Sequence, residues 1–194
     1  MLWLEDRDDH VLITWRNETR MLASRVIRAK LGHKSELPER GEPIVVRRNV
    51  YGTDLMNGDL VHVEEWMQEG PTLAGIETRY LRVRTTNGVR PILLVPTQKF
   101  DGTMPYVPLS DMRRAVKNAN AEDPTPVTWG YALTAHLSQG SEYRRVTTIL
   151  PGDLQNPYFR KMTRLPTGEA MPFSLRFLYT SITRAKSHST LIIA

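Results

Sequence analysis

The hydrophobic and polar positions at the start of the chain predict an α/β unit. Residues 10–15 (HVLITW) form a short apolar run that is typical of a buried strand. A helix is expected next, because Asn17 is a favourable N-cap, Glu18 suits the positive end of the helix dipole and Gly32 can end the helix. The expected apolar stripe of this helix consists of Leu22, Ala23, Val26, Ile27 and Leu31. A strand followed by a helix is the opening of an α/β fold.

The middle of the chain is rich in short strand-like segments. Four of them lie between turn signals, at residues 43–47, 59–64, 80–85 and 91–95. Asn57-Gly58 and Asn87-Gly88 are each flanked by such segments, and Asn-Gly is the strongest short signal for a hairpin. Several short strands in so little sequence predict a small barrel. A short helix is expected after them, at residues 111–120.

After residue 127 the α/β pattern returns. Strands are expected at residues 130–134, 145–150 and 190–194. A second helix is predicted from a cap at Ser174 through Lys186. One face of this helix carries apolar residues at i, i+3, i+4 and i+7, and we expect that face to pack on a core. These residues are Leu175, Leu178, Tyr179 and Ile182.

Length and composition restrict the class of protein. The 194 residues suit an α/β domain of residues 1–34 and 128–194, interrupted by a β-rich insertion of residues 35–127. The absence of cysteine excludes disulfides, zinc fingers and thiol catalysis, and the five histidines show no metal-ligand spacing, so we expect no metal site. No apolar run is long enough to span a membrane, and the start of the chain does not look like a signal peptide. A soluble, cytoplasmic protein without a membrane partner is expected.

Positive charge is concentrated near the end of the chain. The formal net charge is +5, and residues 144–186 contain eight Lys and Arg against two acidic residues. Such a cluster suits a polyphosphate ligand, because phosphate charge supplies most of non-specific nucleic-acid affinity. A solvated basic surface is the alternative.

Two segments carry candidate chemistry. Residues 132–142 (ALTAHLSQGSE) place hydroxyls, an imidazole, an amide and a glycine after a predicted strand, where ligands of open α/β sheets bind. Hydroxyls and backbone N–H groups there can hold phosphates, and Glu142 can accept from a ribose hydroxyl. Arg184, on the predicted second helix, is expected opposite the apolar stripe. It is either a solvated residue or an arginine that reaches a phosphate.

Together these segments resemble motifs five and six of superfamily-one helicases of the RecD/UvrD-like group. Residues 132–142 and residues 178–186 (LYTSITRAK) match the two motifs. Residues 41–65 resemble the segment that opens the family's SH3-like barrel, and residues 11–32 resemble the strand and helix that begin its second RecA-like domain. The resemblance implies a RecA-like parallel-sheet domain interrupted by an SH3-like β-barrel.

The resemblance also implies roles for individual residues. Arg184 is the expected arginine finger toward ATP, with Gln139 as a second catalytic residue. Gly140 and Glu142 are expected at the nucleotide, and Arg16 and Asn17 to face the same cleft. Thr134, His136 and Ser138 are expected to contact single-stranded DNA. Leu137 stands where the family usually has lysine, so weak DNA binding is expected.

The first motor domain of that family has no counterpart in the sequence. There is no Gly-x-x-x-x-Gly-Lys-Ser/Thr phosphate loop and no Asp-Glu pair. ATP and Mg²⁺ are therefore expected to be bound mainly by an N-terminal RecA-like domain, in the same or a separate polypeptide, and this chain alone is expected not to hydrolyse ATP. Two alternatives stay open: a non-catalytic nucleic-acid-binding module, and an inactive subunit of a nuclease or recombination complex.

Overall fold

The chain forms two compact units, which are described separately. The computed structural model describes residues 10–97, 107–150, 157–164 and 167–193. The parallel-sheet unit comprises Met1–Arg25 and Tyr131–Ala194, and the antiparallel-sheet unit comprises Val26–Gly130. Among the described residues, no helix has the length and hydropathy needed to cross a membrane.

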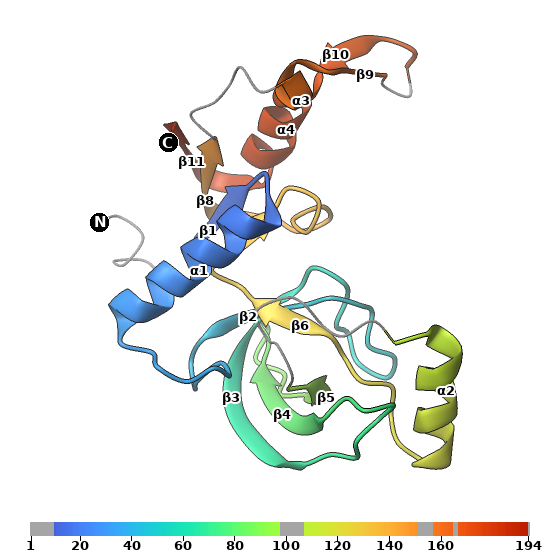
Figure 1. The fold of residues 1–194 in the computed structure, drawn as a ribbon. Helices are drawn as coiled ribbons and strands as arrows, with labels where there is room; N and C mark the ends of the chain where they lie inside the picture. The colour runs from blue at the N-terminus through green and yellow to red at the C-terminus, as the bar shows by residue number, and fades with distance from the viewer. Residues whose placement is uncertain (1–9, 98–106, 151–156, 165–166, 194) are drawn as a thin grey trace. The chain divides into compact units, whose positions relative to one another are not determined.

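A four-stranded parallel sheet forms the first unit, in the order β11-β8-β1-β7 (Figure 1). Its strands are β1 (His10–Thr14), β7 (Ala132–Thr134), β8 (Tyr143–Leu150) and β11 (Ala185–Ile193). The remaining elements are the first part of α1 (Asn17–Leu31), α3 (Pro157–Arg160), α4 (Phe173–Ile182) and a hairpin of β9 (Met162–Arg164) and β10 (Ala170–Pro172). Val11, Ile13, Leu133 and Val146 are buried in the sheet. The predicted α/β class with a parallel sheet is confirmed.

An aromatic cluster anchors α3 and α4 at the end of β1. The Phe159 ring lies 4.3 Å from that of Trp15, and 6.0 and 6.2 Å from those of Phe173 and Phe177. Three of these pairs meet edge to face or nearly so, the geometry that aromatic quadrupoles favour. Phe159 and Phe177 are buried, so the cluster is the core on which α4 packs.

This core corrects the prediction for α4. The helix begins at Phe173 rather than after a Ser174 cap, and it ends at Ile182, so Arg184 lies beyond it. Its buried residues are Phe177 and Ser181, whereas three residues of the predicted apolar stripe are largely exposed. These are Leu175, Tyr179 and Ile182. The physical reason is that Phe177 packs on Phe159, in a cluster with Trp15 and Phe173, and these aromatic contacts set the inner face of the helix.

The inner face predicted for α1 is also wrong. The helix has the expected bounds and ends at Gly32, whose φ of +86° favours glycine. Its buried residues, however, are Arg20, Ser24 and Arg28, at i, i+4 and i+8. Leu22 is 62% exposed and Val26 is 47% exposed. A polar face is buried because Arg28 has a buried carboxylate partner.

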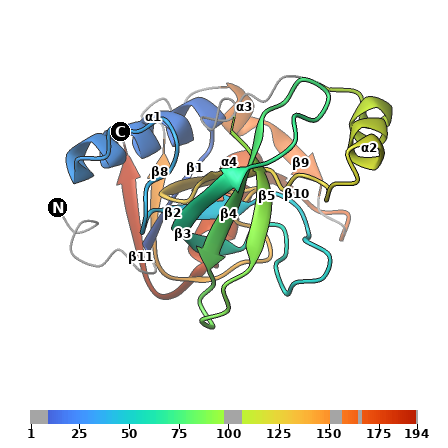
Figure 2. The same ribbon diagram turned by 90° about the horizontal axis from the view of Figure 1, so that it is seen from below.

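The second unit contains a five-stranded antiparallel sheet in the order β5-β4-β3-β2-β6 (Figure 2). The strands are β2 (Pro43–Val46), β3 (Leu60–Glu69), β4 (Thr78–Arg84), β5 (Ile92–Pro96) and β6 (Val127–Trp129), and α2 (Leu109–Asn118) is the unit's own helix. The Asn87-Gly88 turn joins β4 to β5 as predicted, with Gly88 at φ +83°. β6 was not expected from the sequence.

Closure of this sheet into an SH3-like barrel stays a prediction. β5 and β6 are the two edge strands of the described sheet. One backbone hydrogen bond, from the N–H of Thr125 to the carbonyl of Leu94 (2.6 Å), links the segment before β6 to β5. The predicted boundaries at residues 35 and 127 likewise remain predictions.

A buried ion pair holds the end of α1 against the start of β2. Arg28 donates through Nε and Nη2 to the two carboxylate oxygens of Glu42, at 2.7 and 2.9 Å. The guanidinium also donates to the carbonyl of Leu37 and lies 4.6 Å from the centre of the Trp129 ring. Arg28 is 6% exposed and Glu42 1% exposed. The hydrogen bond to Leu37 and the contact with the Trp129 ring help to offset the free-energy cost of removing both charges from water.

Glu39 closes the loop between α1 and β2. Its carboxylate accepts the backbone N–H groups of Ser35 and Lys34, each at 3.0 Å, and lies 3.1 Å from Nδ1 of His33. These contacts stabilise the ionised carboxylate. The bond from Ser35 contributes most, followed by those from His33 and Lys34. They lower the pKa of Glu39 from 4.5 to about 2.

Removal of one partner of the buried pair is expected to be strongly destabilising. Glu42→Ala leaves the Arg28 guanidinium buried without its carboxylate, and we expect a loss of about 3–5 kcal/mol in urea unfolding. The exposed pair of Arg82 with Glu65 (2.7 Å) is the control, and Arg82→Met there is expected to cost less than about 1 kcal/mol. Equal effects of the two variants would contradict the role given to the buried pair.

Glu39 is expected to make folding stability dependent on pH in acid. Because its pKa is lowered in the folded chain, its contribution is complete above about pH 4.5 and disappears as the pH falls toward 2. Glu39→Gln should therefore flatten the dependence of the melting temperature on pH between 4.5 and 2. Glu36→Gln, in the same loop, is the control. An unchanged slope in the Glu39 variant would refute the assignment.

Candidate functional site

The ends of β1 and β7 bring two of the predicted site segments together. The strands are parallel, with Thr14 in register with Thr134. The Thr14 hydroxyl donates to the carbonyls of Arg16 (3.1 Å) and Leu133 (3.5 Å), which ties the exit of β1 to β7. Arg16 is exposed, with its guanidinium 4.8 Å from the Trp15 ring centre. Arg16 and Asn17 therefore lie at the same sheet edge as Thr134.

The segment after β7 is a tight, hydrogen-bonded turn. The N–H of Ser138 donates to the carbonyl of Thr134 (3.1 Å), and its hydroxyl donates to the carbonyl of Ala135 (2.9 Å). Ser138 is fully buried, so its side chain closes the turn. His136 and Gln139 are exposed on it. The turn thus presents an imidazole and an amide on a fixed backbone.

Two further residues show why the turn has this shape. Gly140 has a φ of +88°, a conformation that favours glycine over residues with a side chain. Leu137, which stands where lysine is usual in the family of the resemblance, is 9% exposed. Its side chain contributes to packing and is not a cationic contact on the surface. The departure from the motif therefore has a structural consequence, as the position is used for the core.

Arg184 is held against the start of β8 by its backbone and by weak side-chain bonds. The N–H of Tyr143 donates to the carbonyl of Arg184 at 2.8 Å. Nη1 donates to the carbonyl of Ser141 and Nη2 to Oγ1 of Thr183, each at 3.4 Å. Nε is buried and has no hydrogen-bond partner among the described residues. A buried polar atom without a partner calls for an explanation, such as a catalytic role or a bound water or ion.

The charge around Arg184 is only partly balanced. Glu142 follows Ser141 on the loop before β8, and its carboxylate is 4.0 Å from Nζ of Lys186. Both of these side chains are more than half exposed, so their attraction is weak in water. The guanidinium fork suits a phosphate, and the neighbouring carboxylate and carbonyl suit hydroxyl donors. Among the described residues there is no group of three or more His, Asp and Glu able to hold a metal ion.

The sheet separates the predicted site residues into two groups. Thr14 is in register with Thr134 on one side and with Ile149 on the other, and Tyr143, beside Arg184, comes six residues before Ile149 in β8. At about 3.3 Å per residue, the two levels are about 20 Å apart along the strands. Arg16 and Asn17 thus lie with Thr134 at the carboxyl edge, and Glu142 lies with Arg184 at the amino edge. That all of these residues face one cleft stays a prediction.

Sequence reasoning missed the residues that hold Arg184. Ser141 and Thr183 supply its two acceptors, and Tyr143 fixes its backbone. A spacing argument does give one signal. At 100° per residue, position 184 continues the face of Phe177 and Ser181, so partial burial of Arg184 follows once the phenylalanines are taken as the core face.

Comparison with known proteins gives a fold but no family. No protein-family model and no curated protein matches the chain. Among solved structures, the chain is similar to the Pif1 helicases of a study of DNA unwinding at forked double-stranded DNA, with 12% identity over 96% of this chain and a TM-score of 0.52. The chain has the fold of part of a Pif1 helicase.

Other solved Pif1 helicases are similar at lower scores. The protein from Bacteroides, in complex with ADP-AlF3 and single-stranded DNA, has 15% identity over 97% of this chain and a TM-score of 0.48. The protein from Candida albicans has 11% identity over 95% of this chain and a TM-score of 0.47. The chain spans 40–45% of the length of these three structures. At such identities the likeness establishes the fold alone.

Proposed function

We propose that this chain is the second RecA-like domain of an ATP-dependent DNA helicase or translocase. The observation that carries the proposal is the buried, unpartnered Nε of Arg184 on a Pif1-like fold, at the position of the motif-six arginine. The fold is shared with helicases described as unwinding forked DNA, and the sequence carries both motifs in the order of that group.

Single-stranded DNA is assigned to the carboxyl edge of the parallel sheet. His136, on the turn after β7, is exposed and supplies a donor and a flat ring for a phosphate or a base. Thr134 positions that turn, because its Oγ1 accepts the N–H of Leu137 (3.4 Å). Arg16, exposed at the same edge, adds a cation, so its contact is assigned to DNA rather than to the nucleotide. The Ser138 contact predicted from the motif is not part of the proposal.

ATP is assigned to the amino edge, where Arg184 lies. The guanidinium has two weak intramolecular bonds and a buried Nε without a partner, so it can turn to the γ-phosphate of a nucleotide held by another domain. There it would stabilise charge that develops during phosphoryl transfer. Glu142 would meet the ribose. Gly140 and Gln139, which the motif predicts at the nucleotide, lie on the turn that carries His136 and are not part of this proposal.

The nucleotide and Mg²⁺ need a partner domain. The sequence has no phosphate-cradling loop, and the described residues contain no acidic cluster for the metal. The residues present therefore fit one side of a nucleotide and not its whole binding site. We assign the other side to a first RecA-like domain, in the same or a separate polypeptide, which is consistent with the 40% share of the Pif1 chain that this chain covers.

Weak, salt-sensitive binding of single-stranded DNA is the expected outcome for the chain by itself. A few phosphate contacts give a log–log salt slope of roughly −2 to −4 with fluorescein-labelled dT20 in fluorescence anisotropy. His136→Ala should weaken binding by about fivefold, which corresponds to one net hydrogen bond. His188→Ala, on exposed β11, is the matched control. No binding at low salt, or equal effects of the two variants, would count against the proposal.

Arg184→Ala separates a catalytic arginine from a structural one. In the isolated chain the change should be neutral or slightly stabilising in thermal melting, because it removes a buried donor without a partner. In a protein that includes the ATP-binding domain, ATP turnover should fall by about a thousandfold while ATP binding persists. Arg176→Ala, on exposed α4, is the control. Turnover that is indifferent to Arg184 would refute its assignment.

A further inference from the structure

Helix α2 of the antiparallel-sheet unit exposes a cluster of cations. No residue of this ten-residue helix is buried. Its basic residues are Arg113, Arg114 and Lys117, and all three are exposed. We call these three residues the α2 basic ridge. They lie outside the motifs on which the proposed function rests.

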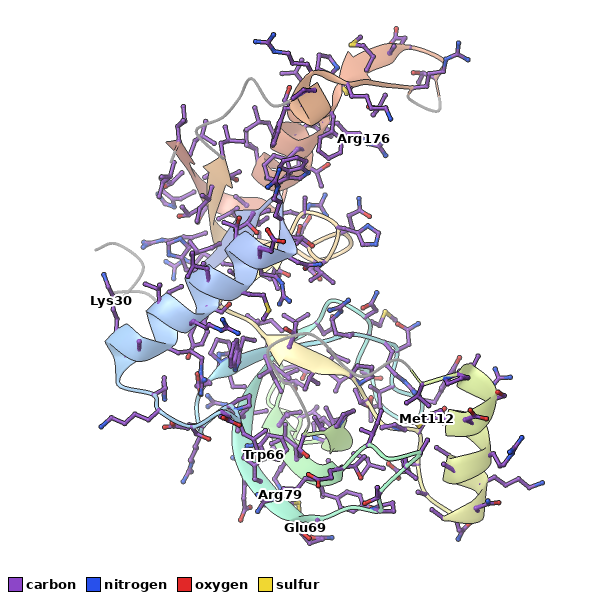
Figure 3. All side chains as sticks on the ribbon, viewed as in Figure 1. Lys30, Trp66, Glu69, Arg79, Met112 and Arg176 are labelled. Carbon is purple, nitrogen blue, oxygen red and sulfur yellow. The ribbon has the colours of Figure 1, made fainter. Side chains whose placement is uncertain are left out.

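The three cations lie on the outer face of the helix. At 100° per residue, the ridge occupies an arc of about 100°, and Met112 lies about 100° to 160° from its members. Figure 3 shows Met112 on the side of α2 that faces the five-stranded sheet. Met112, Ala115 and Val116 are half-buried, which fixes this side as the inner one. The ridge therefore faces solvent.

The ridge also lacks the carboxylate partners that several other arginines of this unit have. Arg28, Arg48, Arg82 and Arg90 each lie within 4 Å of a carboxylate. By contrast, none of the three ridge side chains has a hydrogen bond or an ion pair with any described residue. Asp111, the acidic residue of α2, lies about 160° around the helix from Arg113 and about 60° from Arg114, and it forms no ion pair with either.

Like charges on one helix face oppose helix formation. Arg113 and Lys117 are one turn apart, at about 6 Å, and such a pair destabilises an isolated helix by a few tenths of a kcal/mol. Within the described residues nothing compensates this repulsion, since no acidic side chain bridges Arg113 and Lys117. A polyanion that bridges them would remove the repulsion. The ridge is thus better suited to a ligand than to internal stability.

We propose that the α2 basic ridge binds the phosphate backbone of single-stranded nucleic acid. Arginine forks match phosphate oxygens, and cations one turn apart on a helix can meet successive charges of a polyanion. The inference rests on the proposed function for the choice of nucleic acid, and it adds a contact on the second unit that the helicase motifs do not supply.

The exposed surface of α2 argues against other partners. Leu109, which is 65% exposed, is the large apolar residue that the helix leaves open, and interfacial membrane helices need a wide apolar face. Protein interfaces likewise centre on buried aromatic or apolar anchors. A surface that offers cations with little apolar area suits a ligand read through its charge.

The experiment compares two triple variants of the 194-residue chain. The ridge variant carries Arg113→Gln, Arg114→Gln and Lys117→Gln, which keep good helix formers in place. The control carries Arg48→Gln, Arg82→Gln and Arg90→Gln, which make the same change in net charge in the same unit. Binding of fluorescein-labelled dT20 is measured by anisotropy from 25 to about 200 mM salt, with melting curves to establish that both variants fold.

The ridge variant should bind dT20 roughly tenfold more weakly at the lowest salt, with a log–log salt slope shallower by about 2, because three phosphate contacts are lost. In the control variant, the affinity for dT20 and the salt slope should change much less. Lysine at all three positions should restore binding. Equal loss in ridge and control variants would reduce the effect to net charge and overturn the proposal.

Three further outcomes distinguish the alternatives. Unchanged dT20 binding in the ridge variant overturns the inference, while loss of binding in His136→Ala would still support the proposed function. Ridge-dependent binding of phosphatidylserine vesicles, with dT20 binding unaffected, would replace nucleic acid by a membrane surface. Ridge-dependent binding of poly-glutamate, again with dT20 unaffected, would replace it by an acidic protein. Either result overturns the proposal.

Discussion

The buried pair of Arg28 and Glu42 is the interaction on which the local structure around it depends. A guanidinium and a carboxylate taken out of water are costly, and they are stable here because each has further partners. Arg28 also donates to Leu37 and stacks on Trp129, and Glu42 also accepts the N–H of Glu39 at 2.6 Å. One polar contact therefore fixes the end of α1, the loop after it, β2 and β6 together. It also explains why α1 turns a polar face inward, since burial of Leu22 and Val26 would require Arg28 to leave its partner.

The second constraint is the parallel register of β1, β7 and β8. In a parallel sheet every strand exit lies at one edge, so the loop from β7 to β8 must run back along the sheet to begin the next strand. Residues 135–142 do this: the N–H of Ser141 donates to the carbonyl of Ser138 (3.3 Å), and the carbonyl of Ser141 accepts from Arg184. A single short motif thereby reaches both edges. The turn that carries His136 and the acceptor of Arg184 are therefore joined by one short segment of the chain.

Much of the fold follows from local sequence, and the failures have a common cause. The bounds of α1 follow from Asn17 and Gly32, and the β4–β5 hairpin follows from Asn87-Gly88. The inner faces of α1 and α4 were predicted wrongly, because the periodicity of apolar residues carries no information about the residues that pack against a helix. Phe177 is buried because it packs on Phe159, which in turn contacts Trp15. Arg28 is buried because it pairs with Glu42. For the site, the sequence located Arg184 and the turn of His136. It did not locate their separation, which depends on strand register.

The burial of Leu137 connects the two proposed nucleic-acid contacts. A lysine at this position would be an exposed or partly exposed cation beside His136, whereas Leu137 is packed and contributes no charge. Electrostatic affinity for a phosphate backbone depends on the number of phosphates neutralised, and this number does not depend on which element supplies the cations. In the proposed binding mode, a chain that uses one motif position for its core obtains its affinity elsewhere, and the three cations of α2 would be one such source. The charge of a binding surface is therefore better judged from the whole chain than from its motifs.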